Sequence, residues 1–399
     1  MKWNKPYELG KRLIFTSAIL AIYMVGRNIL LFGIDADAFR PDNPDSYNLL
    51  MSMISGDRYR HTVFALGIMP YISASLTLMV YMAIRGSDYK SRTSPQKMER
   101  MTFILMFPFA LMSAISFSTN LIFGDLGISN GVLRFIAIIE MIIGAVIIFK
   151  MAELNKNHGI GGQTAIICVN VLDNFLVTAG KVSWLENKEL LILCVAMAVI
   201  ILVIENALIR VPVQRVSIHN IYADKSYIAF KLNPIGVMPV MFASSFFMIP
   251  QFIISFFLYL DKDNAMLQGI NESLKFTDLV GVIVYLAIIF ILDVAFSFIM
   301  LSPGDIATNL QKSGDSIVGI YAGKKTKQYL RGKVLLLSSI SGILLCSMMG
   351  TSLVLSLRGD ISSDLALFPA TVMILIGLIC PICQEIKSYI RYDSYSFFI

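Results

Sequence analysis

The sequence predicts an all-α polytopic membrane protein with ten transmembrane helices in two inverted five-helix halves. Of its 399 residues, 56% are hydrophobic and only 15% are charged, whereas a soluble domain carries about 25% charged residues. The mean hydropathy is +0.71. Apolar runs of transmembrane length recur along the whole chain, and one short Gly-x-Met-Pro segment occurs twice. The composition, the hydropathy and the apolar runs predict the class, and the repeated segment predicts the two halves.

The apolar runs are bounded by charged or turn residues, and a helix of about 20 such residues crosses a bilayer. They predict spans at 12–32, 67–84, 99–121, 132–150, 161–179, 189–209, 236–260, 279–301, 333–355 and 364–386. The segment 34–60 between the first two spans is broken by Pro41 and Pro44 and is too polar to cross. It predicts a short re-entrant or pore-capping helix.

The basic residues predict the orientation. With the N-terminus inside, 23 of the 33 Lys and Arg fall in cytoplasmic segments, as the positive-inside rule requires. An even number of spans then puts both termini in the cytoplasm. The net charge of +6 therefore reflects topology and is no sign of nucleic-acid binding. The cytoplasmic loops 210–235 and 302–332 are long enough to serve as docking surfaces.

The two halves are predicted from a repeat. Gly67-Ile68-Met69-Pro70, followed by Ala74-Ser75, recurs 169 residues later as Gly236-Val237-Met238-Pro239, followed by Ala243-Ser244. One copy begins the second span and the other begins the seventh. Five spans per half give opposite topologies, so halves 1–180 and 181–399 are expected to enclose a pathway at their interface. Two coincidental Gly-Pro breaks in apolar helices are the alternative.

Twelve consecutive residues carry a resemblance to a known family. The run from Phe64 to Ser75 resembles the signature motif of the SecY family. Further matches follow in the same order: Gly159-Ile160-Gly161, Asn233 to Pro239 with Phe242-Ala243-Ser244-Ser245, and Ala307 to Gly314. The resemblance implies a clamshell of ten helices around a pore, with a plug helix and a lateral gate between spans two/three and seven/eight.

The resemblance also implies function and partners. It implies a channel that passes secreted polypeptide across the lipid bilayer of the cell membrane, with a SecA-type motor ATPase and a SecE-like small membrane subunit. A ring of bulky apolar side chains can pass a chain and hold back ions by dewetting. The implied ring residues are Ile68, Ile72, Thr164, Cys168, Met241 and Leu375, with Ile374 as the alternative register for the last.

Two of these ring positions depart from the usual aliphatic residue. Thr164 and Cys168 are smaller and slightly polar, so either the register slips there or this pore is looser than its relatives. For Ile68, Ile72 and Met241, ordinary helix packing is the alternative to a pore role.

The implied plug and gate fall on short segments. The plug is expected at Tyr47, Leu50, Met51 and Ile54, whose apolar face would be held under the ring by a small buried area. A lateral gate needs helices that separate at low cost, which small side chains allow. The expected gate residues are Ser73, Ser75, Thr77, Ser244 and Ser245.

Three carboxylates lie within spans, at Glu140, Asp173 and Asp293. Intramembrane acids point to ion coupling by default, so an ion-coupled secondary transporter is the alternative function. No basic partner is evident within the spans, which favours interhelical hydrogen bonds or a place near the pore instead. The five cysteines are predicted to be core residues, including the C-x-x-C of Cys380 and Cys383. We predict no enzyme activity, metal or cofactor, since no catalytic motif is present.

The cytoplasmic loops depart from housekeeping SecY. Where those proteins carry arginines, this chain reads Ser302-Pro303-Gly304-Asp305 and Gly319-Ile320-Tyr321-Ala322-Gly323. The change resembles the accessory SecY group of some Gram-positive bacteria, which works with a dedicated SecA paralogue to export glycosylated adhesins. Motor docking is then expected at Lys324, Lys325, Lys327 and Tyr321, with topology alone as the other explanation for the lysines.

Overall fold

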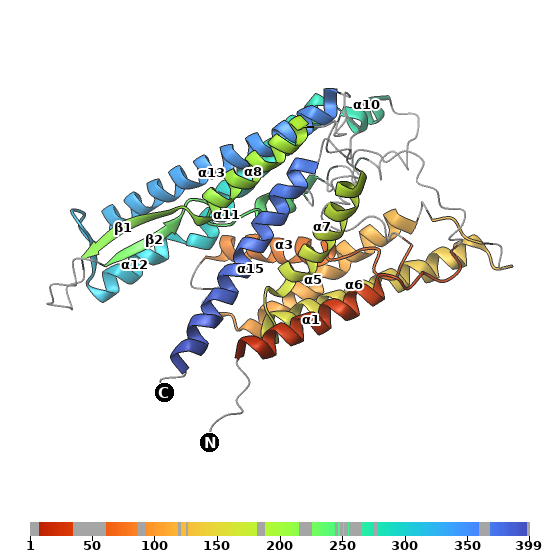
Figure 1. The fold of residues 1–399 in the computed structure, drawn as a ribbon, viewed down its shortest axis with the longest axis horizontal. Helices are drawn as coiled ribbons and strands as arrows, with labels where there is room; N and C mark the ends of the chain where they lie inside the picture. Colours follow the sequence, from red (N-terminus) through yellow and green to blue (C-terminus); the bar gives the residue numbers. More distant parts are fainter. Residues whose placement is uncertain are drawn as a thin grey trace, which may run out of the picture. The chain divides into compact units, whose positions relative to one another are not determined.

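The computed structural model describes residues 8–34, 61–86, 89, 92–118, 121–124, 127–181, 188–214, 226–243, 246–247, 250, 254, 265–273, 278–358 and 368–396. It is mostly helical, which confirms the predicted class (Figure 1). The chain forms two compact units. The first comprises Met1–Leu78, Ser94–Asn187 and Ser363–Ile399, and the second comprises Met79–Thr93 and Lys188–Ser362.

The first unit is built from long helices. They are α1 (Glu8–Gly26), the start of α3 (Met69–Arg85), α5 (Pro95–Ser118), α6 (Asn130–His158), α7 (Gly162–Lys181) and α15 (Phe368–Ser396). Helix α6 packs against α1, α5 and α7, and α15 packs against α7 and α1. The last helix of the sequence therefore belongs to the same unit as the first.

The second unit combines helices with a small sheet. Its elements are α8 (Lys188–Asn206), β1 (Leu208–Gln214), β2 (Tyr227–Lys231), α10 (Ala265–Ser273), α11 (Leu279–Leu301), α12 (Pro303–Ser313), β3 (Ser316–Ile317) and α13 (Lys324–Arg358). The three strands are antiparallel in the order β2-β1-β3. The sequence reading did not predict these strands, which lie in the two loops expected to be docking surfaces.

Nine of the ten predicted spans coincide with helices, and of the seventh span, 236–260, the described residues 238–243 are helical. Within the described part, seven helices are long and apolar enough to cross a membrane. Helix α3, with 17 residues, and the apolar stretch Leu190–Asn206 are shorter. The total of ten spans stays a prediction, as does the division at residue 180. The plug residues Tyr47, Leu50, Met51 and Ile54 lie outside the described residues.

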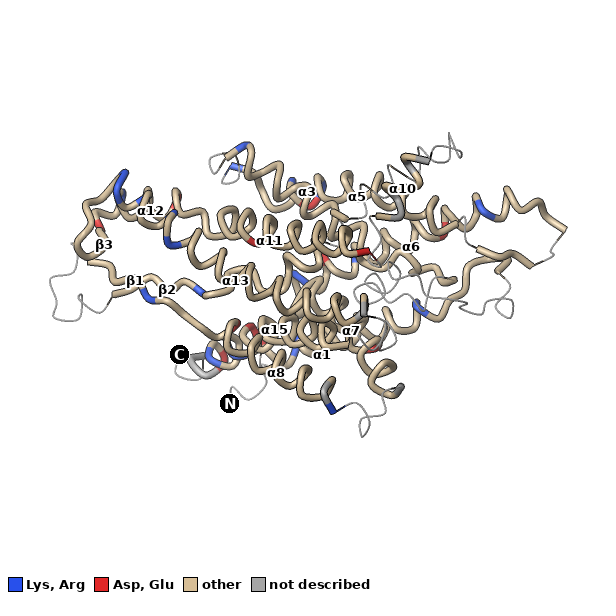
Figure 2. Tube along the Cα trace, turned by 90° about the horizontal axis from the view of Figure 1, so that it is seen from above, with Lys and Arg blue, Asp and Glu red and all other residues tan. Residues whose placement is uncertain are grey.

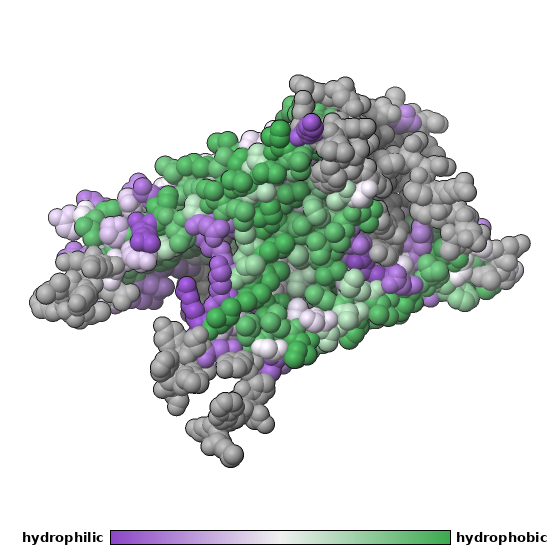
Figure 3. All heavy atoms as spheres, in the orientation of Figure 1, coloured by the Kyte–Doolittle hydropathy of each residue, from purple (hydrophilic) through white to green (hydrophobic). Residues whose placement is uncertain are grey.

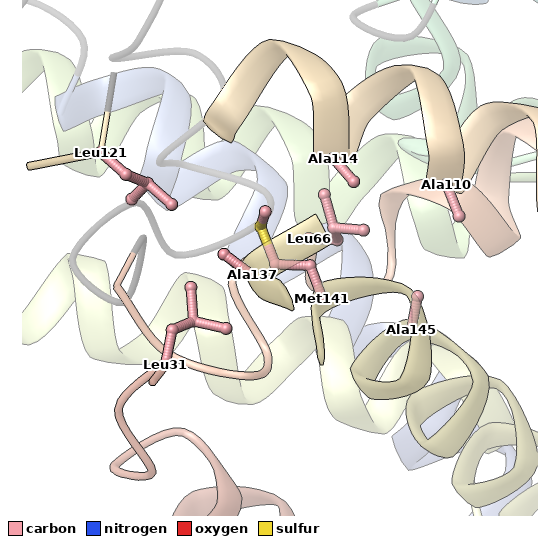
Figure 4. Close-up of a cluster of buried hydrophobic side chains, with 8 residues drawn as sticks. All are labelled: Leu31, Leu66, Ala110, Ala114, Leu121, Ala137, Met141 and Ala145. Atoms are coloured by element: carbon pink, nitrogen blue, oxygen red, sulfur yellow. The ribbon is translucent and has the colours of Figure 1, made fainter. Parts of the chain in front are cut away.

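The first unit holds a core of small side chains between α5 and α6. Its buried members are Leu31, Leu66, Ala110, Ala114, Leu121, Ala137, Met141 and Ala145 (Figure 4). The alanines allow close approach of the two helix backbones. A Cβ at Gly144 would overlap the carbonyl oxygen of Val63, and one at Gly26 would overlap the ring of Phe64. The segment that leads into α3 therefore lies directly on α6 and α1.

The outer surface is apolar. Ile14 of α1 is 73% exposed and Ile192 of α8 is 68% exposed, and in Figure 3 hydrophobic residues cover most of the visible helix surface. In Figure 2 the long helices carry few charged residues along their middles. Large apolar surfaces of this kind mark contact with lipid or protein. Together with the spans, they identify a multi-span membrane protein.

The C-terminal end of α15 is fixed by one polar face. Glu385 accepts a hydrogen bond from the Gly161 backbone amide at 3.0 Å. The Arg12 guanidinium lies 4.8 Å from the centre of the Tyr389 ring. Asp393 accepts a hydrogen bond from the Leu9 amide at 3.2 Å, in the first turn of α1. The three α15 residues recur every fourth position, so they share one helix face.

Candidate functional site

The repeated motif begins α3 in the first unit. Gly67 has a positive φ of 53°, a conformation that glycine adopts at little cost. Ile68 and Ile72 follow, and both side chains are buried. Tyr71 donates a hydrogen bond to Glu153 of α6 at 3.0 Å, and its ring meets that of Phe149 edge-on. The start of α3 is thus fixed on α6 by a polar and an aromatic contact.

The predicted gate hydroxyls of α3 bond to their own helix. Ser75 donates to the Ile72 carbonyl and Thr77 donates to the Ser73 carbonyl, both at 2.8 Å. These hydroxyls are therefore satisfied without a partner on a neighbouring helix, so separating the helices would break no hydrogen bond made by Ser75 or Thr77. Their predicted partners Ser244 and Ser245 lie outside the described residues.

Helices α7 and α15 run antiparallel, and their contacts place two predicted ring residues at the same height along the helix pair. The Phe175 and Phe368 rings stack at 5.2 Å. At the other end, a Cβ on Gly161 would lie 3.2 Å from the Ile382 side chain. Both contacts fit a single antiparallel register, which places Cys168 at the level of Leu375. Cys168 and Thr164 are half-buried, and Leu375 and Ile374 are buried.

The second motif copy is held by an acid that the sequence reading missed. Glu205, 2% exposed at the end of α8, accepts a hydrogen bond from the Asn233 amide at 3.1 Å. Asn233 in turn accepts one from the Gly236 amide at 2.9 Å, and Gly236 has a positive φ of 71°. This Glu205–Asn233–Gly236 chain fixes the beginning of the seventh span. Its place inside the predicted span 189–209 marks Glu205 in the sequence, but its contact with Asn233 is not apparent there.

Met241, the ring residue predicted in this span, is buried. Nearby, Tyr285 of α11 donates to the Val240 carbonyl at 3.3 Å, and the Phe242 and Phe296 rings lie 5.2 Å apart. Met241 thus lies on a segment packed against α11. The other five predicted ring residues belong to the first unit, and their joint pore role stays a prediction.

Two of the three intramembrane acids have partners. Glu140 accepts a hydrogen bond from the Phe32 amide at 2.9 Å. Asp173 forms an ion pair of 2.8 Å with Arg27, whose side chain is 5% exposed. The expectation that no basic partner lies within the spans is therefore wrong. Arg27 and Asp173 are 146 positions apart and meet only through the packing of α1 on α7, which no local pattern reveals.

The predicted docking lysines form the first turn of α13. Lys324, Lys325 and Lys327 are all exposed. Lysines at a helix N-terminus lie next to the positive end of the helix dipole and destabilise the helix. Local helix stability therefore does not explain these lysines. Tyr321 is 80% exposed, and the Lys325 ammonium lies 5.4 Å from its ring centre. The three lysine charges therefore stand on a helix.

A small buried core supports the docking turn. It joins the strands, α12 and the first turns of α13 through Val211, Phe230, Ala307, Ile317, Leu330, Val334 and Leu337. Thr326, 1% exposed, donates to the Tyr321 carbonyl at 2.9 Å and so fixes the backbone of the turn. Figure 1 shows these elements together at one end of α11 and α13. The lysines and Tyr321 thus lie on the surface of a well-packed group of strands and helices.

The SecY family model matches residues 62–382. Among similar proteins are two accessory Sec system protein translocase subunits SecY2. The one from Leuconostoc gelidum subsp. gasicomitatum is 27% identical over 98% of this chain and 97% of its own length. The one from Streptococcus gordonii is 26% identical over 98% of each.

Solved structures of low sequence identity share the fold. One described as a protein conducting channel has a TM-score of 0.66 at 16% identity and covers 98% of this chain and 94% of its own. Sec61 in the canine ribosome-channel complex has a TM-score of 0.63 at 15% identity, with the same coverage. Because the family model spans most of the sequence and includes both motif copies, the chain belongs to the SecY family.

Proposed function

We propose that this chain is the protein-conducting channel subunit of an accessory Sec translocase in the cell membrane. A SecA-type ATPase, namely a SecA paralogue dedicated to this channel, would drive unfolded polypeptide through it. A SecE-like small membrane subunit would bind the channel. The substrates would be glycosylated adhesins, and both termini would face the cytoplasm.

One observation carries the accessory assignment. The resemblance places Gly304 and Tyr321 at positions where it implies arginines in housekeeping SecY proteins, while three exposed lysines occupy the helix turn beside Tyr321. A Cβ at Gly304 would lie 3.4 Å from the Lys327 Cε, so Lys327 already occupies space next to that position. Arginine binds carboxylates through a rigid bidentate fork, and lysine binds them as a mobile point charge. This surface therefore suits a different motor from the housekeeping one.

The pore role of Ile68, Ile72 and Met241 can be tested by cross-linking. Single cysteines at these positions should form cross-links to a stalled translocating substrate, because a ring that closes around the chain must touch it. The readout is the fraction of substrate shifted to the cross-linked band on a gel.

Matched controls separate the pore from the lipid face. Ile139 and Ile143 on α6 are 42% and 51% exposed, and cysteines there should stay unlinked. Equal cross-linking at α6, with none at the three motif positions, would contradict the pore assignment.

A second test concerns the predicted plug. Deleting residues 45–55 should leave the protein inserted and raise ion conductance in planar bilayers, because the resemblance assigns this segment to sealing. Unchanged conductance with normal insertion would argue against a plug here.

A further inference from the structure

Asp293 of α11 differs from three other acids within the predicted spans. Glu140, Asp173 and Glu205 each make a hydrogen bond or ion pair. The Asp293 side chain is fully buried, and neither carboxylate oxygen has a hydrogen-bond partner among the described residues. A buried charge without a partner is costly, and an intramembrane acid points to function by default.

Two serine hydroxyls near this carboxylate are also buried without a hydrogen-bond partner in the described structure. Ser297 lies one turn further along α11, on the same face as Asp293. Ser341 of α13 faces the carboxylate without reaching hydrogen-bond geometry. Both serines are fully buried, and neither hydroxyl has a hydrogen-bond partner in the described structure. Ser341 thus faces Asp293 across the two helices, and Ser297 follows Asp293 one turn along the same face of α11.

The backbone makes room for this cluster. A Cβ on Gly342 would lie 3.3 Å from Asp293 Oδ2 and 2.9 Å from the Phe290 ring, so the carboxylate reaches the α13 backbone where a side chain would crowd it. The nearby thiol of Cys346 donates to the Leu286 carbonyl at 3.2 Å and is thereby engaged elsewhere. Helices α11 and α13 pack extensively, which seals the cluster from bulk water.

We propose that Asp293, Ser297 and Ser341 form a binding site for a monovalent cation, with sodium as its natural occupant, between α11 and α13. Carboxylate and hydroxyl oxygens are hard ligands that suit alkali cations better than soft transition metals. One carboxylate balances a single positive charge. In the described residues, no three His, Cys, Asp or Glu side chains come together to hold a metal ion, which disfavours a divalent or transition-metal site.

The test uses the full-length protein purified in detergent. Its thermal unfolding midpoint is measured in sodium chloride and in choline chloride at equal ionic strength and pH, with potassium chloride as a third arm. A ligand that binds only the folded state raises the midpoint, so sodium should raise it above both other salts. Retention of radioactive sodium on a desalting column gives a direct second readout.

Variants assign the effect to these side chains. Asp293→Asn should lower sodium retention by about tenfold or more, since losing the only charged ligand removes at least about 1.4 kcal/mol of binding. Ser341→Ala should weaken it as well and serves if Asp293→Asn does not fold. Ser338→Ala is the matched control: Ser338 is equally buried on α13, but its hydroxyl already bonds the Leu335 carbonyl.

Two results would overturn the proposal. One is the same midpoint in sodium, potassium and choline for the unmodified protein. The other is sodium retention that survives both Asp293→Asn and Ser341→Ala. Either result would mean that Asp293 is protonated or is hydrogen-bonded to water instead of binding a cation.

Discussion

Replacing Lys324, Lys325 and Lys327 together by glutamate should abolish association with the motor in physiological salt. The three charges lie in one exposed helix turn, and reversing them turns attraction of an acidic partner into repulsion. Electrostatic steering raises association rates by about 10- to 1000-fold, so we expect at least about a tenfold loss in the association rate. Surface binding of the purified SecA paralogue at several salt concentrations measures it.

A charge-matched control is available in the first unit. Lys11, Lys387 and Arg391 are exposed and are expected to be cytoplasmic, so changing them to glutamate alters the net charge equally. That variant should bind the motor normally. The triple-glutamate variant could also insert correctly and still bind and export at the normal rate. In that case these lysines only keep their loop in the cytoplasm.

Replacing Glu205 by alanine should destabilise the second unit by about 1–3 kcal/mol, because the buried Asn233 amide then loses its hydrogen-bond acceptor. Glu205→Gln keeps a carbonyl oxygen in reach and should retain most of the stability. Since the Glu205–Asn233–Gly236 chain fixes the start of the seventh span, alanine should also increase labelling of a cysteine at Met241. Unfolding in mixed micelles and thiol labelling rates measure the two effects.

The neighbouring residue provides the control. Asn206 is exposed and donates a hydrogen bond to the Leu202 carbonyl of its own helix, so Asn206→Ala should change neither readout. Glutamine behaving as badly as alanine would show that the charge of Glu205 matters rather than its hydrogen bond. A wild-type response from both variants would contradict the role of this chain of contacts.

The sequence predicted those parts of the fold that depend on hydropathy along the chain. Each helix that crosses lipid must be apolar over about 20 residues, so the α6, α11 and α13 regions were evident. The strands β1 to β3 were not. Strand β1 follows directly on the apolar run of α8 and contains Pro212, which argues against a strand, and β2 and β3 have only five and two residues. Their formation depends on burial of Val211 and Phe230 against α12 and α13, which is a tertiary effect.

The site was predictable where one motif carries it and unpredictable where distant residues meet. Ile68, Ile72 and Met241 are buried within the motif copies, although burial alone does not separate a pore role from packing. The Arg27–Asp173 pair joins the residue that follows α1 to helix α7, and Glu205 meets Asn233 across a hairpin. Such contacts are set by helix packing, so hydropathy and spacing gave no sign of them.

The polar face at the end of α15 has a consequence for biosynthesis. Glu385 and Asp393 complete contacts with Gly161 and with the first turn of α1, yet α15 follows every helix that it contacts in the chain. The first unit therefore cannot close while the chain is being made, and α1 to α7 must wait in the bilayer for their final neighbour. A nascent chain lacking α15 should be open to proteolysis at the α6–α7 turn, and its completion should make the same turn resistant.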